Sequence, residues 1–253
     1  MSTKTCGRGM PIKTGGTDIE VMYRETGPEG YPVVCTDEGD LAQVVVDEEG
    51  FRSVDVFFRG EQSVARALAD LSDRLYHEAH RQTQAAIATG EIRLTDEMES
   101  KFADAEVRLR ELDERYGRDF PRSQYDCGMT VGKIAALLWL EGGERGSTDE
   151  LIREDGTPFI IRRSLDDVRK EVAILREKAW WNHHQNWLWE IERGMDEIGC
   201  EKIFASARKS ARRIEKKYGK ENLGWSDYEW GMLSGHLSAL RWVLGYDWDM
   251  LDV

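Results

Sequence analysis

The stretch SQYDCGMTVGKIAALLWLEG at residues 123–142 returns in altered form at residues 226–245 as SDYEWGMLSGHLSALRWVLG. The two stretches share nine identities in twenty positions without a gap, where average residue usage gives roughly one or two by chance. Upstream, KFADAEVRLRELDERYG (101–117) aligns with IFASARKSARRIEKKYG (203–219). The offset between the matched segments stays near 102 to 106 residues, which predicts an internal tandem duplication.

Each copy follows the same order of elements. We predict a mainly α (α+β) fold in which copy one spans residues 41–143 and copy two spans residues 144–253. Each copy is a short β-hairpin followed by three helices, and the two copies pack pseudo-symmetrically through their first and third helices. The expected hairpins are 41–58 and 149–161, and the expected helices are 62–89, 96–116, 123–142, 165–193, 197–218 and 226–245.

The residues that recur in both third helices are expected to serve the fold. Ser123 and Ser226 each precede an acidic residue three positions on, which is the pattern of a capping box. Small residues at helical spacing let another helix backbone approach closely, and a tryptophan closes each stripe. These structural residues are Gly128, Gly132 and Trp139 in copy one and Gly231, Gly235 and Trp242 in copy two.

The first forty residues have no counterpart in copy two. The segment CGRGMPIKTGGTD (6–18) superficially resembles a phosphate-binding loop, but Ile12 stands where that loop needs a glycine before Lys13. We therefore predict a Gly-rich N-terminal arm over 1–40 that covers a sheet edge or orders on binding. At the other end, the acidic-aromatic tail 246–253 is expected to dock Trp248 and Leu251 onto its own domain, and the alternative is an extended peptide offered to another protein.

Composition narrows the class of protein. The chain has 253 residues, a net charge of −13 and 40% hydrophobic residues, as expected for a globular acidic protein. No apolar run has the length of a membrane span, and the N-terminus lacks the apolar core of a signal peptide. The four scattered cysteines form no CxxC pair, which favours reduced thiols and a cytoplasmic location.

One stretch is specific to copy two: AWWNHHQNWLWEIE at 179–192. His183 lies on the apolar stripe of the expected helix and His184 lies well off it, while the tryptophans point in several directions. Such a helix is expected to be covered on two sides, either by packing between the copies or by a partner, since aromatic residues dominate binding hot spots. Packing is the favoured interpretation, and the candidate partner-binding residues are Trp180, Trp181, His184, Trp187 and Trp189.

The two second helices differ sharply in charge. Residues 96–116 carry eight acidic and four basic residues, whereas residues 200–218 carry two acidic and seven basic residues. The two helices could lie near each other and attract, or each could be a solvated face, or the basic helix could bind phosphates or an acidic partner. The candidate residues on the basic helix are Arg208, Arg212, Arg213 and Lys216.

Helix-borne histidines raise the alternative of a metal site. In YHEAHRQ (76–82) the two histidines stand three residues apart, one short of the spacing in HExxH. The alternative ligands are His77, His80, His183 and His184, with Glu78 or Glu190 as acid/base. A metal-dependent enzyme is therefore kept as an alternative, although no cofactor is predicted.

The leading hypothesis for function is a non-enzymatic, acidic protein-interaction module, such as an adaptor, an inhibitor or an accessory subunit. Its partner is expected to be a protein bound through surfaces that differ between the copies. A nucleic-acid binder, or an acidic mimic of nucleic acid, is a further alternative. No membrane partner is expected, and the sequence leaves open a monomeric pseudo-dimer or a homo-oligomer.

Overall fold

The computed structural model describes residues 11–14, 17–26, 30–46, 50, 52–116, 123–148 and 158–249. The described residues form a small antiparallel sheet and six α-helices, so the prediction of a mainly helical α+β fold is confirmed. The strands are β1 (Pro11–Thr14), β2 (Thr17–Thr26), β3 (Pro32–Cys35), β4 (Leu41–Val46) and β5 (Arg52–Phe58). The helices are α1 (Glu61–Ala88), α2 (Asp96–Tyr116), α3 (Gln124–Glu141), α4 (Leu165–Glu192), α5 (Glu201–Tyr218) and α6 (Asp227–Val243).

The sheet is a meander in which each strand pairs with the next in the order β1-β2-β3-β4-β5. The predicted hairpin of residues 41–58 is the β4–β5 pair, with Val44 opposite Val54. Strands β1 to β3 come from the first forty residues and extend the same sheet. The described part of the predicted N-terminal arm therefore pairs strand by strand with the edge of the hairpin, which corresponds to the alternative in which the arm covers a sheet edge.

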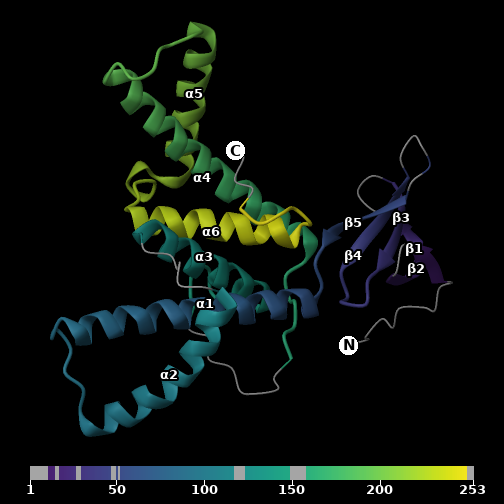
Figure 1. The fold of residues 1–253 in the computed structure, drawn as a ribbon. Helices are drawn as coiled ribbons and strands as arrows, with labels where there is room; N and C mark the ends of the chain where they lie inside the picture. Colours follow the sequence, from purple (N-terminus) through teal and green to yellow (C-terminus); the bar gives the residue numbers. More distant parts are fainter. Residues whose placement is uncertain are drawn as a thin grey trace.

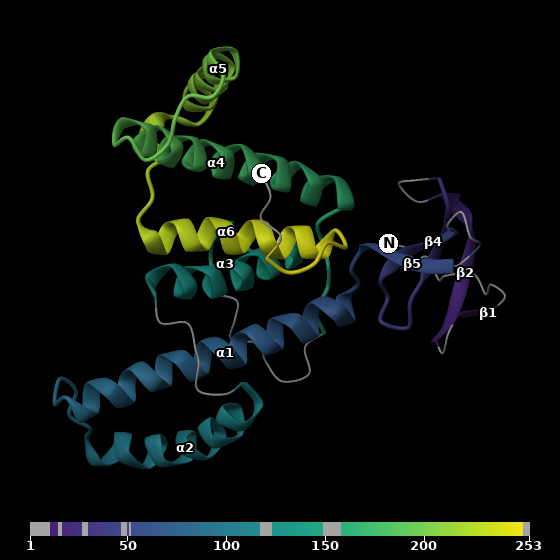
Figure 2. The same ribbon diagram turned by 45° about the horizontal axis from the view of Figure 1, so that its top comes forward.

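Helices α3 and α6 lie side by side and parallel at the centre of the molecule (Figures 1 and 2). Their glycines sit directly against the partner helix's backbone. A Cβ at Gly128 would overlap the carbonyl oxygen of Tyr228, and a Cβ at Gly231 would overlap the carbonyl oxygen of Tyr125. One turn later, Gly132 meets Met232 in the same way. The predicted role of these glycines in close helix packing is confirmed.

A second reciprocal contact lies at the C-terminal end of each of these two parallel helices. The guanidinium of Arg59 stacks on the Trp242 ring, and its Nε donates to the Trp242 carbonyl. Arg163 makes the same two contacts with Trp139. Arg59 lies two residues before α1, so its contacts hold the start of α1 against the end of α6. Arg163 lies two residues before α4 and holds the start of α4 against the end of α3 in the same way.

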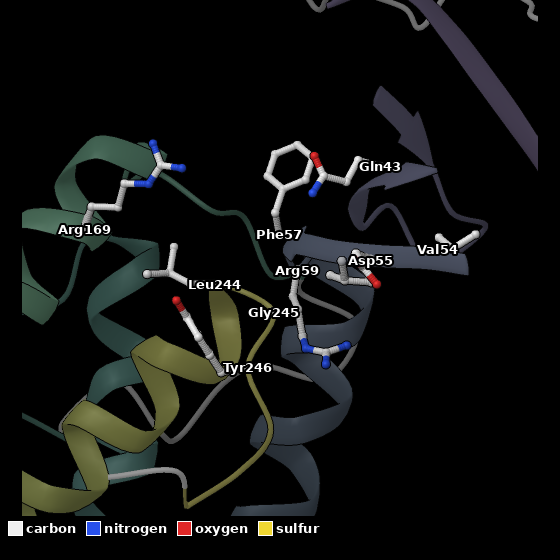
Figure 3. A pocket seen from close by; sticks show the side chains of 10 residues that line it. Gln43, Val54, Asp55, Phe57, Arg59, Arg169, Leu244, Gly245 and Tyr246 are labelled. Carbon is white, nitrogen blue, oxygen red and sulfur yellow. The ribbon is translucent and has the colours of Figure 1, made fainter. Parts of the chain in front are cut away.

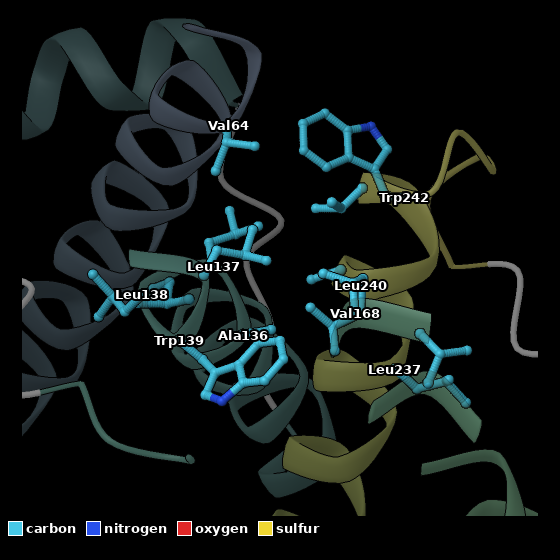
Figure 4. Packing of buried hydrophobic residues seen from close by; sticks show 14 of the residues in the cluster. Val64, Ala136, Leu137, Leu138, Trp139, Val168, Leu237, Leu240 and Trp242 are labelled. Carbon is cyan, nitrogen blue, oxygen red and sulfur yellow. The ribbon is translucent and has the colours of Figure 1, made fainter. Parts of the chain in front are cut away.

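The hydrophobic core surrounds α3 and α6. Leu137, Leu138 and Leu240 are fully buried there, together with Val64 from α1 and Val168 from α4 (Figure 4). The predicted helix starts are also observed: Ser164 and Ser226 form complete capping boxes, and Ser123 caps α3 by accepting from the Asp126 backbone N–H. These caps and the apolar faces fix where each helix begins and which side it buries.

Two helical arms project from the core. Helix α2 packs on α1, and helix α5 packs on α4. Figures 1 and 2 place α2 and α5 at opposite ends of the molecule, on either side of the α3–α6 pair. The idea that the acidic and basic second helices attract each other within one chain is therefore wrong, because each packs on its own long helix instead.

The second predicted hairpin, at 149–161, is not observed in the four of its residues that the structure describes, 158–161. Residues 149–157 lie outside the described residues, and residues 158–161 form no strand. Phe159 is buried in the main core, and the Ile161 N–H donates to the side chain of Glu61. Residues 158–161 therefore place Phe159 in the core from an irregular segment and do not pair as a strand.

Candidate interaction surface

The α4–α5 arm holds most of the site residues predicted from sequence, and it is built on a small core of its own. Trp181, Ala211, Ile214 and Leu223 are buried together, with Trp180, Tyr218 and Trp225 packed against them. Trp181 Nε1 donates to Glu215 at 3.3 Å, which ties the two helices of the arm. Helix α4 thus has two buried faces, one on α6 and one on α5. This arrangement explains why its tryptophans point in several directions.

Two predicted partner-binding residues are therefore inside the protein. Trp181 is 6% exposed and His184 is 5% exposed, so neither is available to a partner. The expected placement of the two histidines was wrong, since His183 is exposed and touches Trp230 edge-on while His184 is buried. His184 is buried because α4 packs on α5 as well as on α6, and the apolar stripe in the sequence indicates only one buried face of the helix.

The buried His184 lies between aromatic rings. It stacks on Trp180 with ring centroids 5.2 Å apart, and Trp187 lies 5.8 Å from it. Among the described residues, its Nε2 has no hydrogen-bond partner. Burial lowers the pKa of His184, and the positive charge of Arg208 lowers it further. A neutral imidazole that packs as an aromatic side chain follows from this environment.

The other arm repeats this arrangement with the opposite charge. Helices α1 and α4 both have 28 residues, and aligning their first residues places His80 opposite His184. His80 stacks on Phe102 at 4.2 Å and on Tyr76 at 5.8 Å. Burial lowers the pKa of His80; Glu106 on α2 opposes this shift, and Arg81 and His77 on α1 add to it. The outer helices of the two arms therefore carry opposite charges beside corresponding histidines.

A groove runs along the outside of the α4–α5 arm. Its volume is about 570 Å³. The small side chains of Ser206, Ala207 and Ser210 on α5 leave this space open, and the Trp180 ring lies on the α4 side. Ile203, also in the lining, is 67% exposed. Arg176, Arg213, Glu177 and Ile214 complete the lining. Glu177 is already paired with Lys217, so among the described residues two arginines supply the unpaired charge at the border of this apolar groove.

The predicted basic residues lie on the exposed face of α5 beside this groove. Arg208, Arg212, Arg213 and Lys216 are all exposed, as is Lys209. Lys217 is used differently, because it bonds Glu177 at 2.7 Å and fixes α5 to α4. That ion pair, with a hydrogen bond from Tyr218, lowers the pKa of Glu177. The basic face that remains is directed to solvent.

The remaining predicted aromatic residues lie toward the tip of the arm. Trp189 is 47% exposed, with the Arg193 guanidinium 4.1 Å from its ring centroid. Trp187 is half-buried, and its Nε1 donates to Asp196 at 2.7 Å. Met195 and Ile198 at the end of the arm are also exposed. Sequence reasoning missed Ile203 and the small residues of α5; their spacing at 203, 206, 207 and 210 was the available signal.

The histidines proposed as metal ligands have other surroundings. His77 is fully buried, and its Nε2 lies 2.6 Å from Asp113 Oδ1, while Asp113 also pairs with Arg81. In the part of the chain that the structure describes, no group of three or more His, Cys, Asp or Glu side chains could hold a metal ion. Within the same residues, no helix is both long and apolar enough to cross a membrane.

A second cleft lies where the sheet meets the helices (Figure 3). It has a volume of about 530 Å³ and is lined by strand residues such as Gln43 and Phe57, by Arg59 and Arg169, and by Tyr246 after α6. Arg59 is already engaged with Asp40 and Trp242. This cleft follows from the joint between sheet and helices, and it contains none of the residues predicted as a site.

No protein-family model, no curated protein and no solved structure matches this chain.

Proposed function

We propose that this protein is a non-enzymatic interaction module that binds an acidic, amphipathic helix of a protein partner in the groove of the α4–α5 arm. The groove itself carries the proposal. It combines an apolar floor of small side chains, an exposed Ile203 and a border of exposed cations. An amphipathic helix places its apolar face in such a groove, and acidic residues along its edges would meet the arginines.

The exposed apolar residues of the arm support a docking role. Of the nine large hydrophobic residues that are exposed among the described residues, four lie on this arm or its tip: Trp189, Met195, Ile198 and Ile203. Exposed apolar groups that gather on one projection and are flanked by polar side chains mark contact sites more often than scattered ones do. Trp189 and the arginines are also residue types that dominate binding energy.

We further propose that the fold arose from a tandem duplication whose arms diverged. The reciprocal contacts of Gly128 and Gly231, and of Arg59 and Arg163, are those of a pseudo-two-fold pair. The core contacts are alike in both halves, while the outer helices α2 and α5 differ in charge. A shared core with different outer faces fits a module that presents two distinct surfaces to its partners.

Cys127 and Cys200 form no disulfide within the described residues, which fits the proposed cytoplasmic location.

Nucleic acid is a second candidate ligand because of the basic face of α5. Five exposed cations on one helix could follow a phosphate backbone, and that binding would weaken steeply with salt. The apolar groove favours the protein partner, since a phosphate backbone makes no use of Ile203.

The test compares three forms of the tagged protein in capture from the cells that make it. The groove variant carries Ile203→Glu and Arg213→Glu. The matched control carries Val46→Glu and Arg52→Glu, which are changes of the same kind at exposed positions of the sheet. We expect a stoichiometric protein partner with the wild type and the control, and its loss with the groove variant, while circular dichroism shows all three folded.

Retention of the partner by the groove variant would contradict the proposal, as would the absence of any stoichiometric protein. Loss of the captured material after nuclease treatment would instead support the nucleic-acid alternative.

A further inference from the structure

The outer face of α2 is acidic, and its charge is not neutralised within the arm. Glu106, Glu111 and Glu114 are exposed, and among the described residues none of them forms an ion pair. Arg108 and Arg115 reach inward to Asp73 on α1. Arg110 is exposed and forms no ion pair among the described residues, so on this face one arginine stands against three glutamates. The structure therefore uses basic side chains of α2 to hold the arm together and leaves the glutamates facing solvent.

The outer face of α5 shows the opposite arrangement. Lys217 reaches inward to Glu177 on α4, which leaves Lys209, Arg212 and Arg213 facing solvent. In the described part of the chain none of these three forms an ion pair. The two arms thus expose complementary charges on corresponding helices.

Each charged face also has one prominent aliphatic residue. Val107 on α2 is 54% exposed, and Ile203 on α5 is 67% exposed. The helices have 21 and 18 residues, or roughly 31 Å and 27 Å at about 1.5 Å per residue. The groove is lined on α5 from Ile203 to Ile214, roughly 17 Å at the same rise, so it can take the segment of α2 from Glu106 to Glu114, with an aliphatic residue on each side of the contact.

The two faces cannot meet within one molecule, because α2 and α5 lie at opposite ends of it (Figures 1 and 2). We propose that the α4–α5 groove of one copy binds the acidic face of α2 of a second copy, so that molecules associate head to tail. This inference rests on the proposed function, because it uses the same groove and names its occupant. Such a contact joins two different surfaces, so it leaves one free acidic face and one free basic face and can continue into a chain of molecules.

The contact should be weak and sensitive to salt, because both faces are exposed and charged. Ion pairs between exposed side chains contribute little individually, and they are screened when the Debye length falls from about 10 Å at 0.1 M to about 3 Å at 1 M salt. At about 0.1 mM protein, which reveals dissociation constants in the micromolar range, we expect oligomers in low salt and monomers in high salt.

Sedimentation velocity of the full chain with reversed charges tests the proposal. The acidic-face variant carries Glu106→Lys, Glu111→Lys and Glu114→Lys, and the basic-face variant carries Lys209→Glu, Arg212→Glu and Arg213→Glu. Each alone should be monomeric in low salt. A mixture of the two should associate again, because the intact basic face of one variant meets the intact acidic face of the other and the two reversed faces are also complementary. A chain carrying all six changes should again form oligomers.

A wild type that stays monomeric in low salt at this concentration would overturn the inference. So would a single-face variant that still self-associates, or a mixture that does not associate. If the wild type is monomeric yet the groove variant Ile203→Glu, Arg213→Glu loses a captured partner, the proposed function stands and a second copy is not the occupant. If the chain assembles but capture yields only the chain itself, the groove serves self-association.

Discussion

The guanidinium carbon of Arg59 lies 4.5 Å from the centroid of the Trp242 ring, and Arg59 Nε donates to the Trp242 carbonyl at 3.1 Å. One side chain therefore covers the tryptophan and satisfies a carbonyl at the C-terminal end of α6, where helix carbonyls lack partners in the helix. It joins the end of strand β5 to the far end of the chain. The same pairing of Arg163 with Trp139 joins the start of α4 to the end of α3.

Replacing Arg59 with methionine should destabilise the protein. The change keeps an apolar stem but removes the cation over the ring and the hydrogen bond, for an expected loss of about 2 kcal/mol in the free energy of unfolding. Arg163→Met should cost a similar amount. Urea denaturation measures both, and Arg66→Met, at a position whose side chain is 71% exposed, is the control. Equal stability of Arg59→Met and the control would contradict the assigned role.

The glycines between α3 and α6 should not tolerate even one methyl group. A Cβ at Gly132 or Gly235 would overlap a backbone carbonyl of the other helix, which no rotamer change relieves. Gly132→Ala and Gly235→Ala should each cost about 3 kcal/mol or more, despite the better helix propensity of alanine. The control is Gly199→Ala, which meets open space. Thermal unfolding of the three variants gives the comparison, and tolerance of Gly132→Ala would show that the helices are farther apart.

Much of this architecture could be predicted from sequence because local signals agree with it. Capping serines, glycines after helices and the apolar stripes placed the helices to within a few residues, and the repeated glycines indicated the α3–α6 contact. Three features could not be predicted in this way. The second buried face of α4 depends on α5 lying against it, so Trp181 looked available while it is in fact core.

The other two failures also have tertiary causes. Residues 158–161 have strand propensity, but Phe159 packs in the core between the helices and the segment forms no strand. The groove depends on Ser206, Ala207 and Ser210, whose small size matters only once Trp180 lies opposite. Local propensity gives no information on such contacts.

His236 should make stability depend on pH. It is buried against Trp139, and burial, with Arg145 and Lys178 nearby, lowers its pKa from 6.5 to about 4. The folded state therefore binds this proton more weakly than the unfolded state does. The stability present above pH 6.5 should be lost as the pH falls toward 4, by about 3 kcal/mol at pH 4.

Replacing His236 with leucine isolates this effect. The difference in unfolding free energy between wild type and His236→Leu should shift by about 3 kcal/mol between pH 7 and pH 4, in favour of the variant at low pH. Urea denaturation at several pH values measures it. His183→Leu serves as the control because His183 is exposed. Parallel pH profiles for wild type and His236→Leu would show that His236 is not titrating against burial.

Glu171 and Arg145 should depend on each other. The Glu171 side chain is 3% exposed and lies 2.5 Å from Arg145, while burial raises the pKa of Glu171. Arg145→Met leaves a buried carboxylate without its partner and should cost about 3 kcal/mol at neutral pH. The double variant Arg145→Met, Glu171→Met removes the charge as well and should recover most of that loss. A double variant as unstable as Arg145→Met would show that the arginine acts through packing alone.

The close contact of α3 with α6 has a consequence for synthesis of the chain. Gly128 lies against Tyr228, a residue 100 positions later, and closing so long a loop costs entropy that short-range contacts do not. On the ribosome, the first half of the chain therefore emerges with the glycine face of α3 uncovered, and it keeps that face uncovered until α6 has been made. During synthesis there is thus a stage in which α3 has been made but α6, the helix that it packs against, has not. During that stage, cellular factors that shield apolar surface have access to a helix that the finished molecule hides.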